Sequence, residues 1–253
     1  MTTEISRPDL QEVFLCIYVK GSLSANNVIR DVRTSSTAVG VLGMGNKGGV
    51  SIRFNLYDTS LCFVCSHLAA HRENVEGRNA DYHSIIEQTI FTPDNNNKNN
   101  INNNNKSGGW VEKPKMGYLR TLTDNLKILD NDCIFWVGDL NYRIDSQITT
   151  QQVFDSINNY SNIIKSNNNK KDKNALKYLI DLAIYDQLNI ERSKPNGPFH
   201  GFTEGPLLFK PTYKYQPGMP DTYDVRNPKK IRAPAWCDRV LWRHNIDNKL
   251  VEL

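Results

Sequence analysis

Long apolar runs are missing from this sequence of 253 residues, of which only 39% are hydrophobic. A membrane-spanning helix needs about 20 consecutive apolar residues, so the sequence predicts no such helix. Residues 1–8 (MTTEISRP) also lack the apolar core of a secretory signal peptide. We therefore expect a cytoplasmic protein. The length of 253 residues predicts one large domain, or at most two.

Cysteine is scarce, with five residues in the whole chain. A sparse, odd set does not predict a disulfide framework and is typical of reduced thiols inside a cell. Cys62 and Cys65 form a C-x-x-C, but the run around them indicates a strand, where residues three apart point to opposite faces. No second C-x-x-C is present, so we interpret these cysteines as core thiols and not as zinc ligands.

A strong excess of positive charge is also absent, because 31 Lys and Arg residues against 27 Asp and Glu give a net charge of +4. Nucleic-acid-binding domains usually have a pI above about 9, and their affinity depends on neutralising phosphates. The sequence therefore predicts no nucleic-acid partner.

Two stretches of low complexity interrupt the globular sequence. Residues 94–106 read DNNNKNNINNNNK and residues 166–174 read SNNNKKDKN. Such segments bury too little apolar surface to offset the entropy lost on ordering. We predict that both are disordered insertions in a single domain spanning residues 1–253.

The remaining sequence alternates patterns typical of strands and helices. Apolar and β-branched runs predict strands over 12–20, 48–56, 60–66, 134–137, 209–215 and 240–242. A helical spacing of apolar residues predicts helices over 76–91 and 175–188, and residues 45–49 (GNKGG) predict a turn. This mixture indicates an α/β or α+β domain with a large sheet component.

A carboxylate and an amide follow the predicted strand 134–137. Asp139 and Asn141 are two residues apart, so we expect them to point the same way at the strand end. An aspartate can orient and deprotonate a water molecule, and an asparagine amide can donate to a phosphoryl oxygen. The alternative is an Asp-x-Asn turn without a catalytic role.

Basic side chains follow another predicted strand. His67 lies at the end of the strand, where an imidazole can contact phosphate or transfer a proton. Arg78 and Asn79 begin a predicted helix, and Arg78 can bind an anion through two hydrogen bonds. The alternatives are a histidine satisfied within a turn and a solvated helix face.

Cations and tyrosines recur near the C-terminal end. Tyr213 and Lys214 lie in PTYKY, and Lys230 and Arg232 lie in a short basic stretch. Cations beside a tyrosine hydroxyl suit a second phosphate, away from the reacting one, whereas the alternative is a solvated basic loop. Asp238 either pairs with the arginine next to it or holds a catalytic histidine.

The order of these motifs resembles the inositol polyphosphate 5-phosphatases, of the deoxyribonuclease-I-like endonuclease/exonuclease/phosphatase superfamily. Two long motifs carry the resemblance, WVGDLNYRI at 136–144 and PAWCDRVLW at 234–242. Shorter motifs support it: MGNKGGVSIRF at 44–54, SHLAAH at 66–71, RNADY at 78–82, GFTEG at 201–205 and PTYKY at 211–215. The resemblance spans residues 12–243, apart from the Asn-rich insertions.

The resemblance implies a fold of two packed, mostly antiparallel β-sheets flanked by helices, here as a partial catalytic domain. It implies a hydrolase that uses Mg²⁺ and an attacking water to remove a 5-phosphate. The substrate would be a phosphoinositide or a soluble inositol polyphosphate, with peripheral contact to a membrane surface and a role in phosphoinositide signalling.

The resemblance also implies a role for each matched residue. Asp139 would position or activate the water, Asn141 would hold the scissile phosphate, and His67 would stabilise its charge. Asp238 matches an aspartate that orients a catalytic histidine. Substrate binding is implied for the remaining residues, four of them around a 4-phosphate and two in a site-lining motif: Tyr213, Lys214, Lys230, Arg232, Arg78 and Asn79.

Two segments of the resembled family have no clear match in this chain. One is an upstream stretch with an Asn and a Mg²⁺-binding Glu, and the other is a Ser-Asp-His segment after the last motif. Leu10–Glu12 is rejected as the Glu segment because FLCIYVK resembles a later strand of the family, which places Glu12 inside that strand and leaves no room for the intervening helix. The metal ligands stay unassigned, and the alternative function is a phosphoinositide-binding module without turnover. A nuclease of the superfamily is disfavoured by PAWCDR, by PTYKY and by the modest charge.

Overall fold

The computed structural model describes residues 2–6, 8–10, 13–26, 28–40, 46–93 and 124–244. The chain divides into two compact units. The first unit comprises Met1–Cys65, Ser84–Phe135 and Arg243–Leu253, and the second comprises Ser66–His83 and Trp136–Trp242. Each unit is therefore assembled from stretches that are far apart in the sequence.

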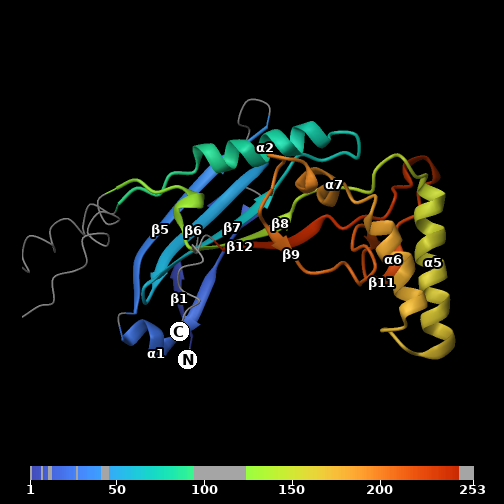
Figure 1. The fold of residues 1–253 in the computed structure, drawn as a ribbon, viewed down its shortest axis with the longest axis horizontal. Helices are drawn as coiled ribbons and strands as arrows, with labels where there is room; N and C mark the ends of the chain where they lie inside the picture. Colours follow the sequence, from blue (N-terminus) through green and yellow to red (C-terminus); the bar gives the residue numbers. More distant parts are fainter. Residues whose placement is uncertain are drawn as a thin grey trace, which may run out of the picture. The chain divides into compact units, whose positions relative to one another are not determined.

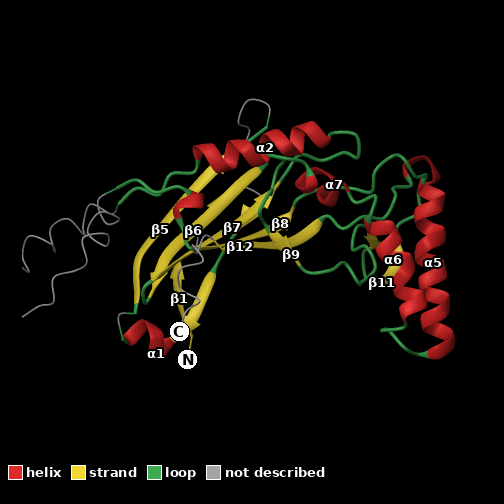
Figure 2. Cartoon of the chain, in the orientation of Figure 1, coloured by secondary structure: helices red, strands yellow, loops and turns green. Residues whose placement is uncertain are grey.

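Strands of the described residues form one six-stranded sheet and three two-stranded pairs (Figures 1 and 2). The six-stranded sheet has the order β5 (Ile29–Ala38), β6 (Gly48–Leu56), β7 (Thr59–His67), β8 (Cys133–Asp139), β12 (Asp238–His244) and β9 (Thr203–Glu204). Its β5–β6 and β12–β9 pairs are antiparallel. The two-stranded pairs are β1 (Thr2–Ser6) with β4 (Ile17–Lys20), β2 (Asp9–Leu10) with β3 (Val13–Phe14), and β10 (Tyr215–Gln216) with β11 (Met219–Tyr223).

Helices accompany these strands, which confirms the mixed α/β class. They are α1 (Gly21–Ala25), α2 (Val75–Gln88), α5 (Thr150–Asn167), α6 (Lys173–Ala183), α7 (Gln187–Ser193) and two short 3-10 turns, η3 (Ile128–Asp130) and η4 (Pro228–Lys230). Within the part of the chain that the structure describes, no helix combines the length and the apolar character needed to cross a membrane.

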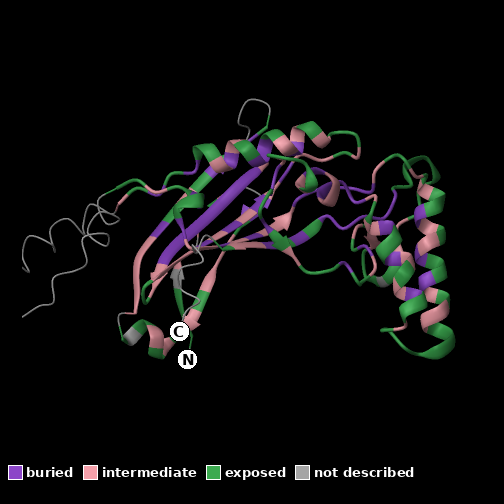
Figure 3. Cartoon of the chain, in the orientation of Figure 1, coloured by how far each residue is buried: buried purple, intermediate pink, exposed green. Residues whose placement is uncertain are grey.

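The first unit is built on β6, which is buried over most of its length (Figure 3). Two buried side chains of this unit, Arg33 on β5 and Arg53 on β6, are arginines that share one carboxylate. Arg33 donates to Asp31 at 2.7 Å, and Arg53 also pairs with Asp31. Burial lowers the pKa of Arg53, although the charge of Asp31 opposes this. The shared carboxylate makes these buried cations tolerable inside the sheet.

The second unit has a core between helices and the last sequence motif. Helices α5 and α6 lie side by side (Figure 1), and Ile157 and Leu179 are among the buried residues between them. Trp236 is fully buried in the same cluster and donates its indole N–H to the Phe209 carbonyl at 2.9 Å. The PAWCDR motif is therefore part of the core of this unit.

Several predicted strands and one predicted helix are confirmed. The predictions over 48–56, 60–66, 134–137 and 240–242 correspond to β6, β7, β8 and β12, and the prediction over 76–91 corresponds to α2. Cys62 is buried and Cys65 is half-buried, as expected for residues on opposite faces of β7. All five cysteines are free thiols.

The single strand predicted over 12–20 is wrong. The structure has two short strands, β3 and β4, which are interrupted at Leu15 and Cys16. The reason is that they have different partners, since β3 pairs with β2 and β4 pairs with β1. Gln11 and Glu12 lie outside the described residues.

The helix predicted over 175–188 is divided in two. Helix α6 ends at Ala183, and Asp186 caps α7 by accepting a hydrogen bond from the Asn189 N–H. A capping aspartate begins a new helix instead of continuing the old one. Ile184, which caps the C-terminal end of α6, is 66% exposed.

The strand predicted over 209–215 is also wrong, because only Tyr215 of that range lies in a strand. Pro211 has no N–H to donate to a ladder, and Tyr213 makes only an isolated bridge with Ala235. Phe209 is 46% exposed. Most of this stretch therefore lies outside the sheets, with Phe209 at the surface and Tyr213 packed against the core of the second unit.

The predicted disorder of residues 166–174 is corrected by the structure, where this stretch comprises the end of α5, the turn at 168–172 and the start of α6. Asn168 adopts a left-handed conformation, and Asp172 caps α6 by accepting from the Asn174 and Ala175 N–H groups. The Asn167 amide also donates to Asp172 at 2.8 Å. Short polar side chains favour such turns because they bond to nearby backbone. The other predicted insertion, 94–106, and Gly45 of the predicted turn lie outside the described residues.

Candidate active site

Two predicted site residues meet where β7 and β8 end. The His67 Nε2 atom lies 3.6 Å from Asp139 Oδ2, and both side chains are partly open to solvent. The Leu68 N–H donates to the Asp139 carbonyl at 3.1 Å, which holds the ends of these strands together. Gly138 makes this approach possible, because a Cβ there would lie 2.1 Å from the Ser66 carbonyl oxygen. The geometry allows a carboxylate and an imidazole to act on one ligand.

Asn141 lies in the turn that follows, with a positive φ of 56°. Its N–H donates to Asp139 Oδ1 at 3.0 Å, so the Asp-x-Asn turn weighed as the alternative does form. Its side-chain amide donates to the Leu68 carbonyl at 3.0 Å. The Leu140 N–H donates to the Cys237 carbonyl at 2.8 Å. The turn therefore places Asn141 beside both strand ends and the PAWCDR motif.

Arg143 joins this turn to the predicted phosphate-binding tyrosine. Its guanidinium donates to Asn141 Oδ1 at 2.5 Å and to the Asn141 carbonyl at 3.0 Å. The same guanidinium stacks on the Tyr213 ring, 4.0 Å from its centre. Sequence reasoning did not assign Arg143 a role, although its place in the WVGDLNYRI motif at 136–144 was a usable signal.

Asp238 belongs to the same electrostatic environment. Its carboxylate lies 3.5 Å from the Thr212 hydroxyl. Desolvation raises the pKa of Asp238, the charge of Asp139 raises it further, and His67 and Arg143 oppose the rise. The structure therefore brings together the four residues predicted as catalytic, His67, Asp139, Asn141 and Asp238.

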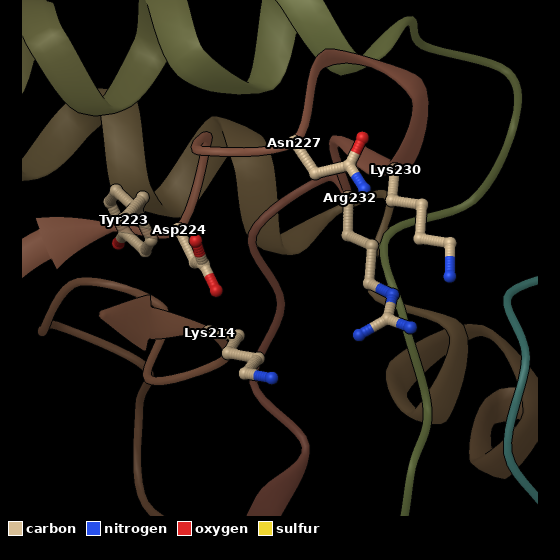
Figure 4. A pocket seen from close by; sticks show the side chains of 6 residues that line it. All are labelled: Lys214, Tyr223, Asp224, Asn227, Lys230 and Arg232. Atoms are coloured by element: carbon tan, nitrogen blue, oxygen red, sulfur yellow. The ribbon is translucent and has the colours of Figure 1, made fainter. Parts of the chain in front are cut away.

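A basic pocket of about 210 Å³ is lined by three of the four residues predicted to bind a second phosphate, Lys214, Lys230 and Arg232, whereas Tyr213 is not among its lining residues (Figure 4). The cationic ends of Lys214, Lys230 and Arg232 gather around its opening (Figure 4). Arg232 donates to the Tyr213 hydroxyl at 2.9 Å. Sequence reasoning missed the uncharged and acidic lining residues, which are Tyr223, Asp224 and Asn227.

Asp224 does not cancel the positive charge of this pocket, because it has its own cation. Arg226 donates to its carboxylate at 2.8 and 3.0 Å. This hydrogen bond lowers the pKa of Asp224 to about 2. Lys214, Lys230 and Arg232 remain in the pocket to face an anionic ligand. Three cations in one pocket favour the binding of phosphate groups.

Arg78 is placed differently from the expectation of an anion-binding side chain. It is fully buried and donates to the His71 carbonyl at 2.6 Å and to Gln187 Oε1 at 2.7 Å. Burial lowers the pKa of Arg78 to about 10. Its donors serve the backbone that follows His67, so Arg78 positions the site and does not reach a ligand in this arrangement.

Asn79 is used in a similar way. Its side-chain oxygen accepts from the Tyr142 hydroxyl at 2.8 Å, and its amide donates to Glu191 at 3.0 Å. Arg72, which sequence reasoning missed, donates to the Ile144 and Asp145 carbonyls at 2.7 Å. Arg72 therefore ties the loop after β7 to the loop after β8, and Asn79 ties α2 to the loop after β8 and to α7.

The matching family model is described as Endonuclease/Exonuclease/phosphatase family 2 and covers residues 3–253. The type II inositol 1,4,5-trisphosphate 5-phosphatase of Mus musculus is 36% identical over 238 residues, which is 91% of this chain and 18% of the relative. Synaptojanin-2 of Homo sapiens is 34% identical over 247 residues, 96% of this chain and 13% of the relative. The type I inositol polyphosphate 5-phosphatase 5 of Arabidopsis thaliana is 31% identical and covers 94% of this chain and 38% of the relative. The chain thus spans less than two fifths of each of these proteins.

Solved structures with similar folds include the inositol polyphosphate 5-phosphatase domain of SPsynaptojanin in complex with inositol (1,4)-bisphosphate and calcium ion. The TM-score is 0.69 at 30% identity, and the match covers 96% of this chain and 55% of that chain. A Cimex nitrophorin is similar in fold alone, with a TM-score of 0.59 at 20% identity.

Proposed function

Because this chain belongs to the endonuclease/exonuclease/phosphatase family 2, we propose that it hydrolyses the 5-phosphate of inositol polyphosphates or phosphoinositides that also carry a 4-phosphate. One observation carries the proposal. Arg143 contacts both Asn141, beside the His67–Asp139 pair, and Tyr213, beside the basic pocket. A substrate with two neighbouring phosphates would place one beside Asn141 and the His67–Asp139 pair and the other in the basic pocket.

The proposed chemistry is attack of water on phosphorus. Asp139 accepts a proton from the water molecule while the water oxygen forms the new bond to phosphorus. The bond between phosphorus and the ring oxygen breaks, and the ring oxygen takes up a proton from solvent and leaves as a hydroxyl. Protonated His67 stabilises the charge of the phosphoryl oxygens.

Asn141 and the basic pocket hold the substrate. An amide nitrogen carries two hydrogens, so the donation from Asn141 to Leu68 leaves a second hydrogen for a phosphoryl oxygen. Lys214, Lys230 and Arg232 bind the second phosphate with charge-assisted hydrogen bonds. This arrangement supports a preference for substrates phosphorylated at both positions.

A divalent cation is part of the proposal, with Mg²⁺ as the expected ion. Asp139 and Asp238 supply carboxylates, which are ligands that Mg²⁺ accepts. However, no group of three or more His, Cys, Asp or Glu side chains among the described residues could hold an ion. The described residues do not fit a complete metal site, so no step is assigned to the cation.

A second candidate is a module that binds phosphorylated inositols without turnover, which the three cations of the basic pocket support. It needs only the basic pocket and the residues around Asn141. It would occur at membrane surfaces or in the cytoplasm, as the enzyme would.

Phosphate release from inositol 1,4,5-trisphosphate with Mg²⁺ tests the proposal. We expect release by the unaltered chain, and a loss of roughly 10²-fold or more in Asp139→Asn, because the general base is removed. Asp155→Asn, an exposed carboxylate on α5, is the matched control and should keep full activity. Binding of the trisphosphate without release would favour the binding module, and absence of both would reject the two candidates.

A further inference from the structure

An apolar hollow lies next to the basic pocket, and one loop lines both. Lys230 and Arg232 line the basic pocket, whereas Ile231 between them lines a separate hollow of about 540 Å³. Ile231 has extended backbone, with φ −63° and ψ 123°. Since Ile231 lines one hollow and both of its neighbours line the other, the loop turns an apolar side to the first and a cationic side to the second.

The lining of this hollow is apolar or uncharged. Val225 and Ile231 are 44% and 42% exposed, and Phe154 of α5 completes the apolar part. The Phe154 ring packs edge-on against Tyr223 with 5.9 Å between ring centres, and Tyr223 lines the basic pocket. The remaining lining residues carry no charge: Thr150, Gln151 and Asn158.

The loop that carries Val225 and Ile231 is also rich in exposed cations. Arg226, Lys229, Lys230 and Arg232 are exposed, and the only carboxylate of residues 224–232, Asp224, is paired with Arg226. Exposed aliphatic side chains surrounded by cations match the interface of an anionic bilayer. There the apolar groups enter the acyl boundary, and the cations are attracted by anionic headgroups.

We infer that residues 224–232 together with Phe154 form a docking edge for an anionic lipid bilayer. A soluble inositol phosphate uses the basic pocket but leaves Val225, Ile231 and Phe154 in water. A lipid in a bilayer uses both sides of the loop. The part of the inference that assigns a lipid substrate rests on the proposed function, because the headgroup would enter the basic pocket.

Sedimentation with phosphatidylcholine vesicles, with and without phosphatidylserine, tests the docking edge. We expect the chain to bind the vesicles that contain phosphatidylserine. The double variant Val225→Ser/Ile231→Ser keeps every charge and should bind them about tenfold more weakly or worse, since two aliphatic side chains no longer leave water. Lys229→Gln should bind about fivefold more weakly.

The matched control is Ile184→Ser, an aliphatic side chain that is 66% exposed and lies outside the loop. It should bind like the unaltered chain. Equal binding by the double variant, or equal weakening by Ile184→Ser, overturns the inference, as does equal binding to vesicles without phosphatidylserine.

Phosphate release separates this inference from the proposed function. We expect the double variant to lose release from 4,5-bisphosphorylated lipid in vesicles by a larger factor than release from soluble inositol 1,4,5-trisphosphate. Vesicle binding that follows the expected pattern, without release from either substrate, supports the docking edge and rejects the proposed function. An equal loss of phosphate release from the two substrates in the double variant rejects the docking edge.

Discussion

Arg143 illustrates how one side chain can set the distance between two binding groups. Its guanidinium is planar, so it can donate in its plane to Asn141 while its face stacks on Tyr213. The residue is only 8% exposed, and this burial limits its rotation. The positions of Asn141 and Tyr213 are therefore coupled through a single rigid group.

Arg143→Lys is the substitution that tests this coupling. Lysine keeps the charge but lacks the planar fork and the stacking face. We expect kcat to fall on the order of 10²-fold, because small displacements of positioned groups are costly, and KM to rise for substrates with a 4-phosphate. Steady-state kinetics on inositol phosphates with and without the 4-phosphate checks this.

A purely structural role for Arg143 would give a different result. It would lower the melting temperature and reduce turnover of both substrates by the same factor, with no selective rise in KM. Lys177→Arg, a change at an exposed position on α6, controls for the effect of exchanging two cations and should leave both constants unchanged.

The site residues differ in how far the sequence could predict them. His67 and Asp139 end strands whose apolar pattern is clear, Asn141 follows the second of them, and Asp238 begins another such strand; the structure brings the four residues together. Arg78 looked like an anion donor because its charge is visible in the sequence. Its complete burial depends on carbonyl groups of other segments, which no local pattern reports.

At the scale of elements, the sequence predicted a strand correctly where the strand's own residues determine it. It failed where the pairing partners determine it. The strand β6 alternates apolar with polar residues along Gly48–Leu56 and pairs antiparallel with β5, so it was predictable. The stretch that became β3 and β4 was not, because its division follows from pairing with two different strands. Turn chemistry was underestimated between α5 and α6, where an Asn-rich composition suggested disorder.

Asp172→Ala tests the contribution of that turn. Asp172 accepts hydrogen bonds from two N–H groups at the start of α6, at 2.8 and 3.0 Å. Losing an aspartate cap usually costs about 1 kcal/mol of the free energy of unfolding, so we expect a loss of this size in urea denaturation. Asn159→Ala, on the exposed side of α5, should change the free energy by less than about 0.5 kcal/mol. Equal stability of Asp172→Ala and the unaltered chain would contradict the ordered turn.

At the scale of the whole molecule, the second unit is held by buried charges as well as by its apolar core. The Arg239 side chain is fully buried and lies 2.8 Å from Asp186 and 2.6 Å from Glu204. Burial lowers the pKa of Arg239, but these two carboxylates outweigh it, so the net pKa is raised. The three residues come from β12, the cap of α7 and β9, which are thereby fixed together.

Arg239→Met should be strongly destabilising for this reason. The variant leaves Asp186 buried without its cation, and breaking a buried pair in this way costs about 3–5 kcal/mol. Calorimetry at neutral pH should show a large fall in melting temperature. The triple variant Arg239→Met/Asp186→Leu/Glu204→Leu removes all three charges and should recover much of the loss. A small effect of the single variant would show that the charges are not buried in solution.

The cysteines give the molecule a pair of internal reporters. Cys62 in the first unit and Cys237 in the second are both fully buried, and burial raises the pKa of Cys237 to about 12. A thiol reacts with alkylating reagents as the thiolate and only when it is accessible. Each of these two thiols is therefore modified only when its surroundings open. Mass spectrometry of the two alkylated peptides would measure the rate at which each unit opens locally, without any introduced label.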